Sequence, residues 1–228
     1  MNLKGYQFPQ DVILETIRYY LAYKLSYREI EEIQAERGIK VDHATIHRWV
    51  VTFTPSLEGW ARRKKKPASG AWRMDETYIK IKGMYWYYYR AVDKYGDVID
   101  YYLSKHRDEA AAKAFLNKAI AQNGLPEKVV IDGSNTNHAA LDAMNVQLWL
   151  TGYFMLCLIE ICNVKYLNNI VEQSHRWVKQ KTRQALGWKS VEGAMASLHG
   201  REVRTMLKRG QIDVEGENAV DRFYALAG

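Results

Sequence analysis

The start of the chain shows the periodicity of short amphipathic helices. Apolar residues recur at helical spacing over residues 10–24, which predicts a first helix. Ser26, followed three positions later by Glu29, forms a capping box that opens a second helix, and Asp42 is placed to cap a third. The second and third helices, joined by a short turn that contains glycine, predict a helix-turn-helix domain over residues 1–53.

Polar side chains near the start of the third helix are candidates for reading DNA bases. In a helix-turn-helix, the amino-terminal part of the second helix meets base edges in the major groove. We expect four side chains to point outward there: His43, Thr45, His47 and Arg48. A plain helical hairpin used only for packing has the same pattern, but the basic segment that follows directly favours DNA binding.

That basic segment predicts a linker between two domains. Residues 54–71 contain Pro55, Pro67 and Gly70, which interrupt regular structure. They also contain five consecutive cations: Arg62, Arg63, Lys64, Lys65 and Lys66. Such charges can simply keep a linker solvated. Between two DNA-binding parts, however, they are better placed to follow phosphates.

After the linker, the period of apolar residues changes from that of a helix to two. Residues 73–82, 84–92 and 98–104 are rich in Tyr, Ile, Val and Trp and are separated by short turns, which predicts an antiparallel meander. A helix over residues 109–122 and a short apolar strand over 128–131 follow. Together these elements predict an α/β fold with a mixed sheet flanked by helices.

Composition narrows the choice of partner and compartment only slightly. The net charge is +7, from 33 Lys and Arg against 26 Asp and Glu, and it favours a polyanionic partner. The two cysteines form no zinc spacing with the six histidines, and the first residues lack the apolar core of a signal peptide. The longest nearly unbroken apolar run, residues 148–159, is too short to span a bilayer, so we expect it to be buried core. We expect a cytoplasmic protein without membrane contacts.

Three acidic residues suggest a metal-dependent site. Asp75 lies in the first strand, Asp132 ends the strand over 128–131, and Glu172 lies on a predicted helix. Alternation along the strand puts Asp75 and Glu76 on opposite faces, so only one can point at a shared site, and we choose Asp75. Asp132 follows the carboxyl end of its strand, where open sheets bind ligands, although a turn-capping role is the alternative.

The helix that carries Glu172 also carries a row of basic residues. Helical spacing puts His175, Arg176 and Lys179 along the same face as Glu172. Ordinary salt bridges are the commoner explanation of such a face. The alternative is a metal ligand beside groups that bind phosphate, and the two other acids favour it. Three carboxylates are able to hold two Mg²⁺ ions for in-line displacement at phosphorus.

Several segments in this order resemble bacterial DDE transposases of the insertion-sequence-six family. The resemblance rests on residues 41–50, 74–83, 89–93, 130–132, 164–173 and 207–211, and it covers nearly the whole chain. It implies a catalytic domain with the ribonuclease-H-like fold over residues 72–210, followed by a tail over 211–228. It also implies Asp75, Asp132 and Glu172 as catalytic residues and as ligands of Mg²⁺ or Mn²⁺, and Lys179 as the basic residue seven positions after the glutamate.

The same resemblance implies an activity and its partners. Family members bind the terminal inverted repeats of their element as double-stranded DNA, cut to leave a 3′ hydroxyl and join it to target DNA, typically forming cointegrates. A homodimer or larger synaptic complex and a place at the bacterial nucleoid are implied likewise. Gly133 departs from the lysine that often follows the second aspartate in the family. The alternatives are a catalytically inactive DNA-binding protein derived from such an element and, less favoured, a general nuclease.

Overall fold

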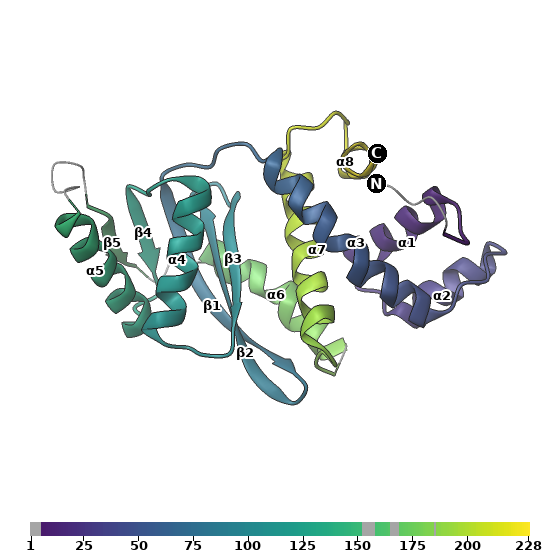
Figure 1. Cartoon of the computed structure of the whole chain (residues 1–228), viewed down its shortest axis with the longest axis horizontal. Coiled ribbons are helices and arrows are strands. Elements are labelled where there is room, and N and C mark those ends of the chain that lie inside the picture. Colours follow the sequence, from purple (N-terminus) through teal and green to yellow (C-terminus); the bar gives the residue numbers. More distant parts are fainter. Residues whose placement is uncertain (1–5, 152–157, 165–168, 185) are drawn as a thin grey trace. The chain divides into compact units, whose positions relative to one another are not determined.

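The computed structural model describes residues 6–151, 158–164, 169–184 and 186–228, and for residues 169–174 it describes the backbone alone. The chain divides into two compact units (Figure 1). The first, the helical unit, combines Met1–Lys66 with Arg183–Gly228, and the second, the sheet unit, is Pro67–Thr182.

The helical unit is built from five described helices. They are α1 (Gln10–Ala22), α2 (Tyr27–Glu36), α3 (His43–Arg63), α7 (Val191–Arg209) and α8 (Ala219–Ala227). The predicted capping box is confirmed, because Ser26 accepts the Glu29 N–H while the Glu29 carboxylate accepts the Ser26 N–H. The predicted cap of α3 is confirmed as well, since Asp42 accepts the Thr45 N–H at 2.9 Å.

Helix α3 is longer than the sequence pattern indicated. It continues through Pro55 to Arg63, so residues 54–63 of the expected linker are helical. Proline disfavours a helix interior. Here Phe53, Leu57 and Ala61 continue the buried face at a spacing of four residues, and that burial outweighs the local preference.

The end of the chain belongs to the helical unit. Residues 183–210, which the sequence pattern grouped with the catalytic domain, fall in this unit together with the residues expected to form a tail. That tail contains α8, opened by a capping box at Asn218. Arg222 of α8 holds this helix against the end of α7. Its Nη1 donates to the Leu207 carbonyl and its Nε donates to the Gly216 carbonyl, both at 3.1 Å.

The sheet unit contains a five-stranded mixed sheet in the order β3-β2-β1-β4-β5. Strands β1, β2 and β3 pair antiparallel, whereas β4 runs parallel to both β1 and β5. The strands are β1 (Ala71–Ile81), β2 (Met84–Asp93), β3 (Val98–Ser104), β4 (Lys128–Ile131) and β5 (Glu160–Asn163). The predicted meander and the strand of residues 128–131 are confirmed, while β5 was not predicted. With its helices this sheet makes the predicted α/β fold, in which a mixed sheet is flanked by helices.

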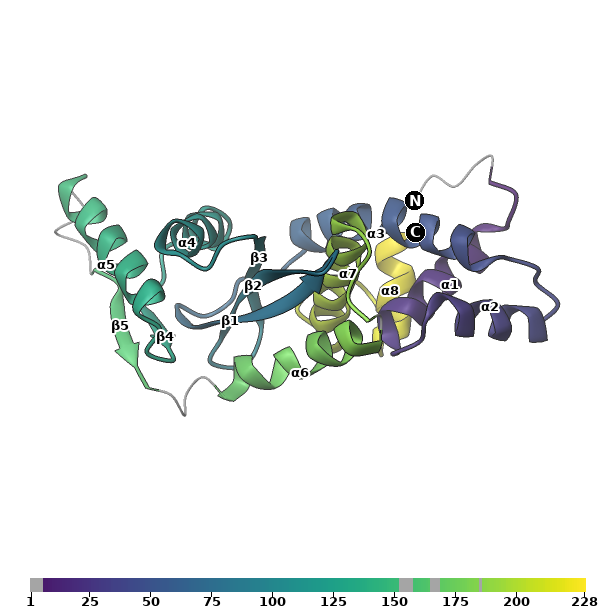
Figure 2. The same ribbon diagram turned by 90° about the horizontal axis from the view of Figure 1, so that it is seen from below.

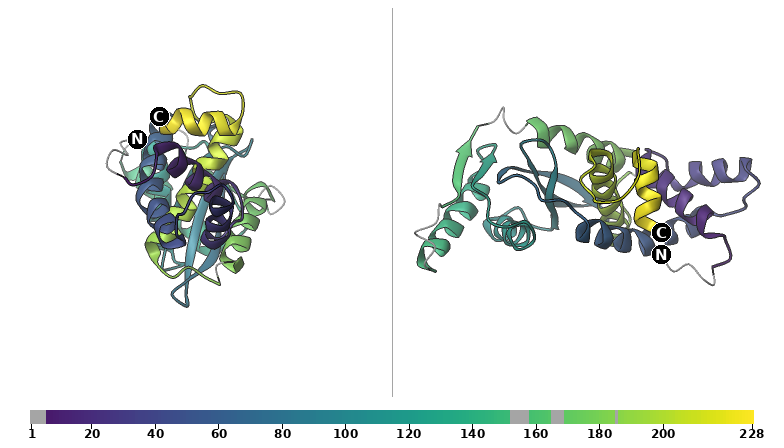
Figure 3. Two further views of the ribbon diagram at one scale, coloured as in Figure 1. Left: turned by 90° about the vertical axis from the view of Figure 1, so that its right-hand side faces the viewer. Right: turned by 90° about the horizontal axis from the view of Figure 1, so that it is seen from above.

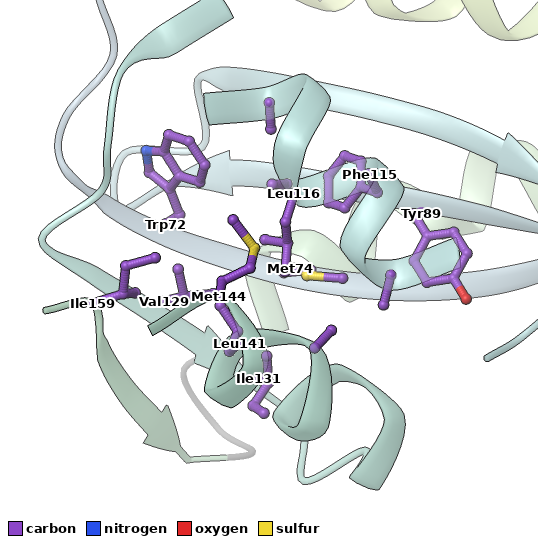
Figure 4. Packing of buried hydrophobic residues seen from close by; sticks show 14 of the residues in the cluster. Trp72, Met74, Tyr89, Phe115, Leu116, Val129, Ile131, Leu141, Met144 and Ile159 are labelled. Carbon is purple, nitrogen blue, oxygen red and sulfur yellow. The ribbon is translucent and has the colours of Figure 1, made fainter. Parts of the chain in front are cut away.

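The helices α4 (Glu109–Asn123) and α5 (Asn135–Leu150) cover one face of the sheet. Trp72, Met74 and Tyr89 from the strands pack there against Phe115 and Leu116 of α4 (Figure 4). Helix α6 (Asn169–Gln184) lies on the opposite side of the sheet from α4 (Figures 2 and 3). The two faces are therefore covered by different elements.

The expectation that residues 148–159 are buried core is wrong for much of the described part of that run. Ile159 is buried, but Trp149, Leu150 and Leu158 are 58%, 70% and 43% exposed. Helix α5 turns Leu141 and Met144 toward the core, and Leu148 of its last turn packs against that core, whereas Trp149 and Leu150 face solvent. Residues 152–157 lie outside the described residues. Within the described part of the chain, every helix is too short or too polar to cross a membrane.

Candidate active site

Strand β1 sends consecutive acids to opposite faces of the sheet, as alternation predicts. Met74 belongs to the apolar core beneath α4 and α5, and Glu76 shares that side. Asp75 points to the side of α6, where its Oδ2 lies 3.2 Å from Nδ1 of His175. Asp75 therefore faces α6, whereas Glu76 faces α5.

Asp132 follows β4 at the level of Asp75. The parallel register pairs Ala71 with Lys128 and Arg73 with Val130, so its continuation by two residues brings Asp132 beside Asp75. The Asp132 side chain is exposed, and its Oδ1 accepts the Ser134 N–H at 3.1 Å. The turn-forming role that the sequence left open is therefore present. A carboxylate that accepts one hydrogen bond from the backbone still has lone pairs with which to bind a metal ion.

Helix α6 carries the third predicted acid, Glu172, whose side chain lies outside the described set. His175, one turn further, is buried, with its ring centroid 6.4 Å from that of Tyr88. Arg176 and Lys179 are exposed. On this helix, His175 therefore points inward to Asp75, whereas Arg176 and Lys179 are accessible to solvent.

A buried arginine lies next to Asp75 along the sheet. Arg90 of β2 is the cross-strand partner of Asp75 in the antiparallel register, and its side chain is buried. Directly opposite residues share a face of the sheet, and opposite charges at such positions attract. Asp75 is thus placed between a buried arginine on β2 and a buried histidine on α6.

Sequence reasoning missed the partners of Glu76. Oε1 of Glu76 accepts bonds from Nε and Nη2 of Arg107 at 2.7 and 2.6 Å, and Oε2 accepts one from Nδ2 of Asn137 at 2.7 Å. The hydrogen bond to Glu76 is the main cause that raises the pKa of Arg107, and the charge of Asp132 adds to it. The available signal was Glu76 itself, because an acid at a core-facing strand position needs a charged partner.

The donor set fits a hard divalent cation. Asp75 and Asp132 supply carboxylate oxygens, and Mg²⁺ binds proteins through one or two carboxylates together with substrate phosphates. Among the side chains that the structure describes, no three of His, Cys, Asp and Glu gather into a complete metal cage. The expected third ligand, Glu172, is not among those side chains.

At the start of α3, the polar side chains form a local network. Oγ1 of Thr45 donates to Oδ2 of Asp42 at 2.7 Å and accepts a bond from Nη2 of Arg48 at 2.8 Å. Nδ1 of His43 lies 2.8 Å from Oε2 of Glu31. Arg48 and His43 are exposed, in agreement with the outward prediction.

His47 departs from the prediction of an outward side chain. It is half-buried, and its ring meets that of Tyr27 edge-on at 5.2 Å. A Cβ placed on Gly193 of α7 would lie 3.5 Å from Nε2 of His47. His47 therefore packs between helices, because its position on α3 faces α2 and α7.

The basic run at the end of α3 is only partly open to solvent. Arg63, Lys64 and Lys66 are exposed. Arg62 instead pairs with Glu58 one turn earlier, and Lys65 is half-buried in a backbone bridge to Ile212. The accessible cations of this run are fewer than its sequence suggests.

Comparison with known proteins identifies the class and then the family. Residues 69–211 match a family model described as a DDE domain, so this part of the chain belongs to the DDE class. The chain is 43% identical over 204 residues to the transposase for insertion sequence-like element IS431mec of Staphylococcus aureus, covering 89% of this chain and 87% of the relative. It is 42% identical over 204 residues to the transposase of IS257 in transposon Tn4003 of the same species, with the same coverage. The chain belongs to the DDE transposases of the insertion-sequence-six family.

Solved structures with a similar trace include retroviral integrases. The catalytic core domain of HTLV-2 integrase, in complex with magnesium, is 16% identical with a TM-score of 0.45, and the match covers 70% of this chain and 97% of that one. A simian T-cell lymphotropic virus intasome in complex with a PP2A regulatory subunit is 12% identical with a TM-score of 0.43, covering 93% of this chain and 74% of that one.

Proposed function

We propose that this transposase cuts DNA at the terminal inverted repeats of its element and joins the freed 3′ end to target DNA, with Asp75, Asp132 and Glu172 as its catalytic residues. The reaction is a pair of in-line displacements at phosphorus. In the first, water attacks the phosphodiester and the 3′ oxygen leaves. In the second, that 3′ hydroxyl attacks a phosphodiester of the target.

The contact between His175 and Asp75 is the observation that carries this proposal. His175 lies one helical turn after Glu172 on α6, so the contact of 3.2 Å ties the helix of the third acid to the face of β1 that carries the first. The register of β4 brings Asp132 to the same level. Three acids from two strands and one helix are then available to one site.

Two Mg²⁺ or Mn²⁺ ions would be held by Asp75, Asp132 and Glu172, and when bound they activate the attacking oxygen and stabilise the leaving one. The chain's own residues supply position and charge. His175 holds one oxygen of the Asp75 carboxylate, which fixes the direction of the other. Arg176 and Lys179, exposed on α6, bind phosphates of the DNA.

The helical unit supplies recognition of the inverted repeats. His43, Thr45 and Arg48 at the start of α3 meet base edges, and Arg63, Lys64 and Lys66 bind backbone phosphates. Because two element ends must be joined, the acting species is a homodimer or larger synaptic complex. Its substrate places it on the nucleoid in the bacterial cytoplasm.

The direct test uses a labelled duplex that carries the element's own end, taken from the DNA flanking the gene. Wild-type protein and the Asp132→Ala variant are incubated with it in the presence and absence of Mg²⁺. We expect nicking at the element end only with wild-type protein and metal, and equal binding of the duplex by both proteins. Binding without nicking in either protein would instead assign the chain to a DNA-binding protein derived from an insertion element.

A further inference from the structure

Arg107 lies in the short connection between β3 and α4, and its guanidinium group rests on a buried carboxylate. Two of its nitrogens, Nε and Nη2, donate to the same oxygen of Glu76. The amide of Asn137 donates to the other oxygen, so Glu76 is held from two sides. The arginine is thereby fixed to β1 at the residue next to Asp75.

One side of this guanidinium remains open. The side chain of Glu76 is 3% exposed, whereas that of Arg107 is 51% exposed. Glu76 takes one N–H from Nε and one from Nη2, which leaves both N–H groups of Nη1 and the second N–H of Nη2 for another acceptor. Neutralising Glu76 does not require that half of the arginine side chain stay exposed to solvent. The anchored fork instead presents donors to solvent at a fixed place.

That place is the rim of the candidate active site. Asn137, which bonds the same carboxylate of Glu76 at 2.7 Å, lies in the first turn of α5, and Asp132 lies in the short connection between β4 and α5. Gly133, directly after Asp132, contributes no side chain of its own. Arg107 therefore supplies a cation at the carboxyl end of β4, from a different part of the sequence.

DNA that approaches this edge meets the carboxylates of Asp75 and Asp132, which repel its phosphates. Arginine forks bind phosphate oxygens by paired, charge-assisted hydrogen bonds. We propose that Arg107 binds a backbone phosphate of the DNA next to the bond that is cut. The assignment rests on the proposed function for the position of the cut bond, but the binding itself requires no catalysis.

The test measures how DNA affinity depends on salt, because each phosphate contact contributes about 0.9 to the slope of log affinity against log salt concentration. Removing Arg107 alone would leave Glu76 buried without its cation, which is strongly destabilising. The reference is therefore Glu76→Gln, and the test variant is Glu76→Gln with Arg107→Gln. The matched control is Glu76→Gln with Lys94→Gln, since Lys94 is an exposed cation in the turn between β2 and β3, at the other end of β1.

All three variants are titrated with the labelled duplex of the element end, with Ca²⁺ in place of the catalytic metal. We expect the test variant to lose about 0.9 of slope relative to the reference and to bind the duplex several-fold more weakly. The control keeps the reference slope. Mn²⁺ affinity, measured by electron paramagnetic resonance, stays equal in the reference and the test variant.

Three outcomes would overturn the inference. An unchanged slope in the test variant means that Arg107 only neutralises Glu76. A fall in Mn²⁺ affinity with an unchanged slope means that Arg107 orients Asp132 instead. An equal loss of slope in the control means that the measurement follows net charge rather than a contact. Because cleavage is never measured, the test remains decisive even if the protein does not nick DNA.

Discussion

The two faces of the sheet bury different kinds of side chain. On the face beneath α4 and α5, Met74, Phe115 and Leu116 are fully buried among apolar neighbours. On the face of α6, the buried groups include His175 and Arg90 beside Asp75. One strand, β1, supplies residues to both faces in alternation.

The α4 face is mostly apolar, with the buried carboxylate of Glu76 and its partners Arg107 and Asn137 as the exception, whereas the α6 face carries the candidate metal ligand Asp75. Burial of apolar surface stabilises a folded protein by roughly 25 cal/mol per Å², and a cavity in such a core is destabilising. The apolar side chains beneath α4 and α5 therefore contribute mainly to the stability of the sheet unit. Buried charges lower the stability of a fold unless they are paired. The polar groups on the α6 face are therefore better explained by a role in the active site than by a contribution to stability. Substitutions on the two faces should therefore fail in different ways.

The largest expected effect is on the polar face. Asp75→Asn keeps the shape of the side chain but removes the charge that binds metal, and we expect strand cleavage to fall by about 10³-fold or more. The midpoint of urea unfolding should fall less than in Phe115→Ala, because no apolar contact is lost, although buried Arg90 loses a neighbouring charge. Rates on the labelled element end and urea curves for the same preparations measure both quantities. A variant that cleaves like wild-type protein would remove Asp75 from the site.

The opposite pattern is expected on the apolar face. Phe115 is fully buried against Tyr89, with ring centroids 6.0 Å apart, so Phe115→Ala should lower the free energy of unfolding by about 3–5 kcal/mol. Trp149→Ser is the matched control, because Trp149 is a large apolar residue that is mostly exposed, and its change should stay within about 0.5 kcal/mol. Equal losses in both variants would contradict the packing described for α4 and α5.

A smaller effect is expected where the polar face positions its carboxylate. His175→Phe keeps a ring but removes the nitrogen near Asp75, and we expect Mn²⁺ affinity to fall by about 10- to 100-fold. His175→Asn keeps a donor close to the position of Nδ1 and should retain most of that affinity. Electron paramagnetic resonance titration measures both variants. If phenylalanine preserves metal binding, His175 serves packing alone.

The smallest effect lies outside the sheet unit. Ser26→Ala removes the hydroxyl that accepts the Glu29 N–H at the start of α2, and it should lower the free energy of unfolding by about 1 kcal/mol. Strand cleavage by the folded variant should equal that of wild-type protein when both are assayed well below their melting temperatures. A large loss of cleavage would show that the distinction between structural and catalytic regions does not hold for this helix.

Local chemistry explains what the sequence was able to predict. The caps at Ser26 and Asp42 and the strands with period two depend on neighbouring residues, and the structure confirms them. Alternation alone separated Asp75 from Glu76, although only the contact with His175 shows which face meets α6.

The remaining features depend on residues far apart in the chain. The continuation of α3 through Pro55 follows from burial of Leu57 and Ala61, which local preference does not reveal. Arg107 joins Glu76 across 31 positions, and no spacing rule connects them. The exposure of Trp149 and Leu150 depends on which side of α5 packs against the core.

We propose that Asp75, Asp132 and Glu172 share one metal site on the α6 face, and iron-directed cleavage of the chain would show whether they do. Fe²⁺ replaces the catalytic metal, and with ascorbate and peroxide it generates radicals that cut the backbone close to its ligands. Mapping the fragments should give cuts near residues 75, 132 and 172, all suppressed by excess Mg²⁺ and absent in Asp75→Asn. Cuts near residues 75 and 132 without one near 172, or cuts that persist in Asp75→Asn, would contradict the shared site.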